Sequence, residues 1–172
     1  MNLTRTERWT LANQYRILEA LYPDEAENMR HAREALQEGF AGEYETLDNH
    51  IYDGPDTMTK EQCREVLDIF RMFSQIHFSL EKLEDKTGID LGMLTFSGFD
   101  GNNETGHMSY ARFLKGPHGD NWPEFTGDLN SHMPSLDVYR RQLAEWKGRS
   151  DEMYLTQEDL QAIAAAARYP RG

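Results

Sequence analysis

The segment from Lys60 to Glu84 constrains the fold more than any other part of this chain. Apolar side chains recur along it at helical spacing on two faces, so only a narrow polar strip remains. The first face carries Cys63, Val66, Phe70, Phe73, His77 and Leu80, and the second carries Ile69, Met72, Ile76 and Leu83. A helix that is apolar over most of its circumference has to be covered on most sides. We therefore expect a long central helix that is covered partly by its own chain and partly by a second copy.

Helical patterns account for most of the remaining sequence. Three helix starts carry a capping-box pair, namely Thr4 with Glu7, Thr59 with Gln62 and Thr156 with Asp159. Further helices are expected at residues 24–39, 43–50 and 105–115 and after Ser135. These patterns predict an all-α fold of about seven helices in a single domain that spans residues 1–172.

The stretch from Gly116 to Pro134 interrupts the helical pattern. It is 19 residues long and contains three prolines and three glycines. Loops longer than about 12–15 residues are uncommon in compact domains. Because Trp122 and Phe125 lie within it, we expect part of this loop to pack on the body of the protein.

Composition restricts the partners and the compartment. The formal net charge of -12 opposes binding to nucleic acids and to anionic membranes. There is no apolar run of about 18 residues, the length that a bilayer span requires. Cys63 is the only cysteine, which fits a reducing compartment. We expect a cytoplasmic protein with no membrane association and no nucleic-acid partner.

The most distinctive local motif is a glycine-punctuated aromatic loop from Phe96 to Glu104, which is followed by a short helical segment. Aromatic residues and arginine are over-represented where binding energy concentrates. The candidate binding residues are Phe96, Phe99, Asp100, Asn102, Glu104, Tyr110 and Arg112. The alternative is that Phe96, Phe99 and Phe113 only hold the loop on the core.

Metal-binding patterns are incomplete in this region. Asp100, Asn102 and Glu104 begin like a calcium loop, but Thr105 replaces the glycine of such loops and Ala111 replaces their bidentate glutamate. Di-iron bundles need two Glu-x-x-His motifs, and the chain has one, at residues 104–107. Zinc ligands from His107, His118 and His132 would be widely spaced loop residues. We expect no metal and no cofactor.

Two pairs of residues on the central helix raise the question of catalysis. Cys63 and His77 lie fourteen residues apart, or about 21 Å along one helix, so they cannot act together within one subunit. Arg71 and His77 resemble the short signature of the HEPN-type helical ribonucleases, whose active sites lie at a dimer seam. The two side chains point about 120° apart around an ideal helix, and we place His77 in the apolar face.

One family resemblance covers residues 3 to 165. The segments Trp9–Leu18 and Cys63–Phe70, the Phe96-x-Gly98-Phe99-Asp100 loop, the Tyr110-x-Arg112-Phe113 helix and the spacing of Tyr139, Leu143 and Trp146 resemble the bacterial YfbU family. The resemblance implies a cytoplasmic, mainly helical bacterial protein. It brings no catalytic residues to transfer to this chain.

Together these observations favour a noncatalytic, homo-oligomeric interaction or regulatory protein with an unidentified protein partner. The alternative is a HEPN-like ribonuclease with Arg71 and His77 at a subunit interface.

Overall fold

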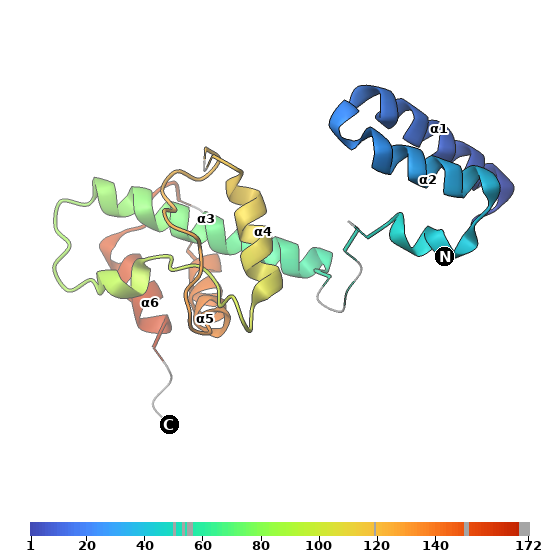
Figure 1. Ribbon diagram of the computed structural model, residues 1–172. Helices are drawn as coiled ribbons and strands as arrows, with labels where there is room; N and C mark the ends of the chain where they lie inside the picture. Colours follow the sequence, from blue (N-terminus) through green and yellow to red (C-terminus); the bar gives the residue numbers. More distant parts are fainter. Residues whose placement is uncertain (50, 53, 55–56, 119, 150–151, 169–172) are drawn as a thin grey trace. The chain divides into compact units, whose positions relative to one another are not determined.

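The computed structural model describes residues 1–49, 51–52, 54, 57–118, 120–149 and 152–168. These residues form six α-helices and three short 3-10 helices, which confirms the all-α prediction. No helix among them combines the length and apolar character needed to cross a bilayer. The chain divides into two compact units, residues 1–54 and 55–172 (Figure 1). A single domain over residues 1–172 stays a prediction.

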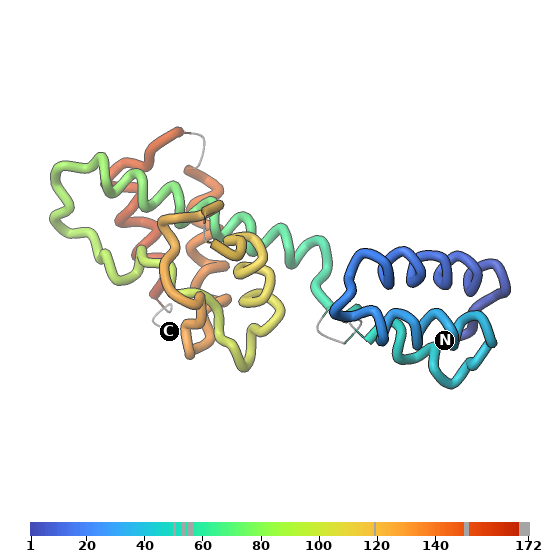
Figure 2. Tube along the Cα trace, turned by 45° about the horizontal axis from the view of Figure 1, so that its top comes forward, coloured from blue at the N-terminus to red at the C-terminus, as the bar shows by residue number. Residues whose placement is uncertain are grey.

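The N-terminal unit is a pair of helices followed by a short 3-10 turn. Its elements are α1 (Arg5–Leu21), η1 (Pro23–Glu25), α2 (Ala26–Glu38) and η2 (Ala41–Thr46). Helices α1 and α2 lie side by side along their lengths (Figure 2). The expected capping box of Thr4 and Glu7 starts α1, and Gly39 ends α2 with a left-handed φ of 78°.

The helix expected over residues 43–50 is instead the 3-10 helix η2, and His50 lies outside the described residues. The buried apolar residues of the N-terminal unit are Ala12, Ala35, Leu36 and Tyr44. Partly buried side chains pack around three of them, namely Leu3, Leu11, Tyr15 and Leu47. The core of this unit is therefore small.

The C-terminal unit is built on the long central helix. Its elements are α3 (Lys60–Lys82), η3 (Leu91–Leu94), α4 (Thr105–Lys115), α5 (Leu136–Lys147) and α6 (Gln157–Ala166). Helix α3 contacts α4 and α5, and α6 packs against α5 and η3. The capping boxes expected at Thr59 and Thr156 start α3 and α6.

The middle of α3 is covered by the chain itself on both apolar faces. Ile69, Met72 and Ile76 on the second face are each 0% exposed, so no second copy is needed to cover them. The sequence argument for a subunit contact at α3 is therefore wrong, because helices and loops of the same unit fill that position. Homo-oligomerisation itself stays a prediction.

The buried sector of α3 shifts around the helix axis between the N-terminal and the C-terminal end of the helix. At its C-terminal end it includes Ser79, whose hydroxyl accepts a hydrogen bond of 2.9 Å from the Leu155 amide. As a result His77 lies outside this sector and is exposed, and Cys63 near the helix start is half-buried. The expectation that His77 belongs to the core is wrong.

An aromatic cluster joins the 96–104 loop and the 116–134 loop to α3. The rings of Phe96 and Phe125 lie 5.2 and 4.7 Å from that of Phe70, and those of Phe96 and Tyr139 lie 5.3 and 5.1 Å from that of Phe73. Edge-to-face and tilted pairs at these separations are favourable. The burial of Phe125 and the half-burial of Trp122 confirm that part of the 116–134 loop packs on the body.

Truncation of the second apolar face tests this enclosure. We expect Ile76→Ala to lower the free energy of unfolding by about 2–5 kcal/mol, because it leaves a cavity in a closed core. Its exposed neighbour Phe78→Ala should change stability by less than about 0.5 kcal/mol. Urea unfolding followed by tryptophan fluorescence measures both. A loss for Ile76→Ala that varies with protein concentration would instead indicate a subunit contact at this face.

Candidate functional site

The loop from Phe96 to Glu104 is held in place by α5 and by the 116–134 loop. Tyr139 donates a hydrogen bond of 2.9 Å to the Gly98 carbonyl. Gly98 has a φ of 92°, and a Cβ at this position would lie 2.1 Å from the Leu129 carbonyl oxygen. Phe99 exchanges backbone hydrogen bonds with Leu129 and Ser131 and is 0% exposed. Phe96 and Phe99 therefore belong to the core.

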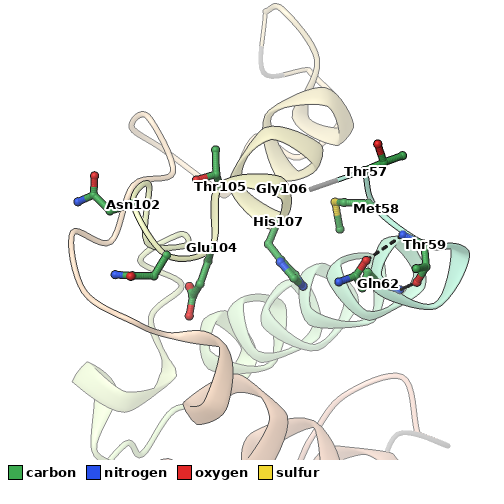
Figure 3. Close-up of a pocket in the computed structure, with 10 residues that line it drawn as sticks. Thr57, Met58, Thr59, Gln62, Asn102, Glu104, Thr105, Gly106 and His107 are labelled. Carbon is green, nitrogen blue, oxygen red and sulfur yellow. Dashed lines mark hydrogen bonds between the residues drawn. The ribbon is translucent and has the colours of Figure 1, made fainter. Parts of the chain in front are cut away.

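Glu104 connects this loop to the start of α5. One carboxylate oxygen accepts hydrogen bonds from the amides of Ser135 and Leu136, at 2.9 and 2.8 Å. The other accepts from the Asp100 amide, also at 2.9 Å, and lies 2.9 Å from the Ser135 hydroxyl. In Figure 3 the side chain points away from α4, down towards this helix. The carboxylate thus caps α5 from a distant part of the chain.

Asp100 organises the tip of the same loop. It is buried, and its carboxylate accepts hydrogen bonds from the Asn102 amide at 2.9 Å and from Asn103 Nδ2 at 2.6 Å. The Asn103 side chain and the Asn102 amide hold the pKa of Asp100 below its ordinary value. Asp100 is therefore a turn-forming residue, whereas Asn102 is exposed.

Two of the predicted residues line a polar cavity of about 380 Å³ between the starts of α3 and α4 (Figure 3). The cavity is lined by Thr57, Met58, Thr59, Gln62, Asn102, Asn103, Glu104, Thr105, Gly106 and His107. His107 is buried, and in Figure 3 it reaches from α4 towards α3. Thr59 and Gln62 are engaged in the capping box of α3.

Behind this cavity, His107 faces an ion pair. Its Nε2 atom lies 3.5 Å from Glu65 Oε2 and has no hydrogen-bond partner in the described part of the chain. Arg140 binds both oxygens of Glu65, at 2.8 and 3.0 Å. This bidentate guanidinium lowers the pKa of the Glu65 carboxyl. Sequence reasoning missed this cluster, since its members come from three different helices.

The chemistry open to this cavity is limited. The oxygens of Glu104 are occupied by backbone amides and a hydroxyl, and those of Glu65 by Arg140. His107 Nε2 has no hydrogen-bond partner among the described residues. Within the described residues, no three His, Cys, Asp or Glu side chains gather as a metal site.

The remaining predicted binding residues lie on α4. Tyr110 is half-buried and stacks on Phe113, with ring centroids 5.9 Å apart, and Phe113 is 75% exposed. Arg112 donates a hydrogen bond of 2.8 Å to the Asp128 carbonyl. Arg112 thus ties α4 to the long loop. Phe113 is a surface residue, so the alternative that it holds the loop on the core is wrong for this residue.

Arg71 and His77, the pair behind the ribonuclease alternative, are both at the surface of α3. Arg71 lies 3.5 Å from Asp68, and His77 Nε2 lies 3.7 Å from Glu81. Arg71 lines a groove that does not include His77. Nearby carboxylates repel RNA phosphates, so this placement gives the pair no support as a nuclease site.

The groove beside Arg71 is rich in aromatic side chains. It has a volume of about 500 Å³ and is lined by Arg71, Ser74, Gln75, Phe78, Trp122, Trp146, Glu152, Met153 and Tyr154. Phe78, Met153 and Tyr154 are exposed. Sequence reasoning missed the groove because its lining comes from three segments that are far apart in the chain.

Internal contacts hold the groove in shape. Gln75 accepts a hydrogen bond of 2.5 Å from the Trp146 indole and donates one of 2.6 Å to the Glu152 carbonyl. Trp122 stacks on Phe125 at 5.8 Å and meets the edge of Phe70 at 5.2 Å. Internal contacts therefore hold both tryptophans in place.

The capping role of Glu104 can be tested by removing its charge. We expect Glu104→Gln to destabilise the C-terminal unit by about 1–3 kcal/mol. The amide nitrogen of glutamine cannot accept hydrogen bonds, so the buried N–H and O–H donors that face it would lose their acceptor. The matched control is the exposed Glu81→Gln, which should cost less than about 0.5 kcal/mol. Urea unfolding of both variants provides the comparison. Equal stability of Glu104→Gln and the unmodified chain would refute the capping role.

The chain matches a known protein family. A family model described as the YfbU domain matches residues 1–166, and so covers nearly all of both compact units. The match confirms the resemblance seen in the sequence. Its description names a domain and no reaction. The chain belongs to the YfbU family.

Proposed function

We propose that this chain is a noncatalytic interaction protein that works as a homo-oligomer. Its partner-binding surface is the aromatic groove between α3, the end of α5 and residues 152–154. The occupant is a peptide segment of another protein that inserts an apolar side chain between Phe78, Trp146 and Tyr154. A carboxylate or carbonyl group of the same segment meets Arg71.

The composition of the groove is the observation that carries this proposal. Tryptophan, tyrosine, methionine and arginine are enriched in the energetic centres of protein interfaces, and all four line this groove. The tryptophans form a fixed floor, whereas Met153 at the rim is long and adaptable. A fixed floor with an adaptable rim suits apolar side chains of more than one shape.

The other surfaces support this role less well. The aromatic loop predicted from the sequence is largely buried, and the carboxylates at the polar cavity are occupied by internal hydrogen bonds. Tyr110 and Arg112 on α4 remain a second candidate surface, marked by the exposed Phe113. The groove differs from that surface because it supplies several aromatic anchors at once.

Selection from a random peptide library tests the proposal. We expect the full-length chain to enrich peptides that pair an aromatic or aliphatic residue with an acidic one. Phe78→Ser should weaken their binding at least about tenfold, because it removes an apolar wall of the groove. Arg71→Ala should weaken binding less and reduce the preference for acidic residues. Fluorescence anisotropy of the labelled peptides gives the affinities.

Phe113→Ser is the control, because it removes another exposed phenylalanine from the same unit but outside the groove. It should leave peptide affinity unchanged. Loss of binding in Phe113→Ser rather than Phe78→Ser would move the surface to α4. Cleavage of RNA by the purified chain that His77→Ala abolishes would contradict the noncatalytic role.

A further inference from the structure

The N-terminal unit has too little core for its size. Four apolar residues are buried among its described residues, and two of them are alanines. Units of this length seldom gain enough stability from one small core without a staple or an association. An additional covered surface is therefore expected for residues 1–54.

The outer face of α1 is apolar and open. Trp9, Ile17 and Leu21 are 69%, 59% and 65% exposed. Together with Thr6, Thr10, Asn13 and Ala20 they fall within about 120° around an ideal helix, so three large apolar side chains share this face with small and polar ones. The opposite side of α1 carries Leu11, Ala12 and Tyr15, which pack in the core of the unit. Helix α1 thus has a second face with large apolar side chains that the N-terminal unit itself leaves uncovered.

We infer that a second copy of this chain covers this face, through antiparallel pairing of α1 with α1 of the other copy. The inference names the contact behind the homo-oligomer proposed above. A two-fold contact uses the same patch on both copies, so the patch has to be complementary to itself. With the axis near residue 15, Trp9 of each copy lies over Leu21 of the other, and Asn13 lies beside Ile17.

The charges at the two ends of the face favour this direction. Arg5 precedes the apolar stripe, and Asp24 and Glu25 follow it. In the described part of the chain, none of the three has an ion-pair partner within the same copy. Antiparallel pairing sets Arg5 of one copy against Glu25 of the other, whereas parallel pairing sets Arg5 against Arg5. Opposite charges at the rim therefore select the antiparallel arrangement.

Sedimentation velocity of the full-length chain over a wide concentration range tests the contact. We expect a reversible dimer whose dissociation constant rises at least about tenfold in Ile17→Glu and in Trp9→Glu. Phe40→Glu is the matched control, because it adds the same charge at an exposed aromatic position of the same unit outside α1. It should dimerise like the unmodified chain. Circular dichroism checks that each variant keeps its helical content.

A charge exchange tests the direction of pairing. Arg5→Glu should weaken the dimer a few-fold, because it turns an attractive rim pair into a repulsive one. Combining it with Glu25→Arg should restore the affinity of the unmodified chain. Failure of the double variant to recover would overturn the antiparallel arrangement.

The outcomes separate this contact from the wider proposal. A chain that is monomeric at every concentration overturns both the homo-oligomer and the α1 contact. A dimer that Ile17→Glu does not weaken overturns the α1 contact alone. Destabilisation of a monomer by Trp9→Glu and Ile17→Glu would show that the chain itself covers this face. Peptide binding in the groove is measured independently of all three results.

Discussion

The enclosure of α3 by its own chain is the constraint on which the C-terminal unit depends. On both apolar faces of this helix the residues from Val66 to Ile76 are buried, and their cover is supplied by loops as well as by helices. Loops can cover a core only when their backbone polar groups find partners. The backbone hydrogen bonds of Phe99 with Leu129 and Ser131, and the carboxylate of Glu104, meet this requirement.

This constraint explains why the most distinctive motif in the sequence is structural. Gly98 lets the loop pass close to Leu129. Phe96 packs against Phe70 and Phe73, and Phe99 packs against Phe96. The two surfaces that we propose as binding sites lie outside this core. One is the aromatic groove beside Arg71, and the other is the outer face of α1 in the N-terminal unit.

Local features were predictable from the sequence because their causes are local. The capping pairs at Thr4, Thr59 and Thr156 set the helix starts, and periodicity identified both apolar faces of α3. Periodicity says that a face needs a cover but not which chain provides it, so the contact that we placed at α3 was wrong. The role of Glu104 and the groove at Trp122 and Trp146 depend on contacts between distant segments, which no spacing reveals.

Hydrogen exchange along α3, measured over a range of protein concentrations, tests the central claim most directly. If the chain itself encloses this helix, the amides between Val66 and Ser79 should be strongly protected, and their protection should not change when the protein is diluted until any oligomer dissociates. Protection that falls on dilution, in step with dissociation, would contradict the account and place a second copy over α3.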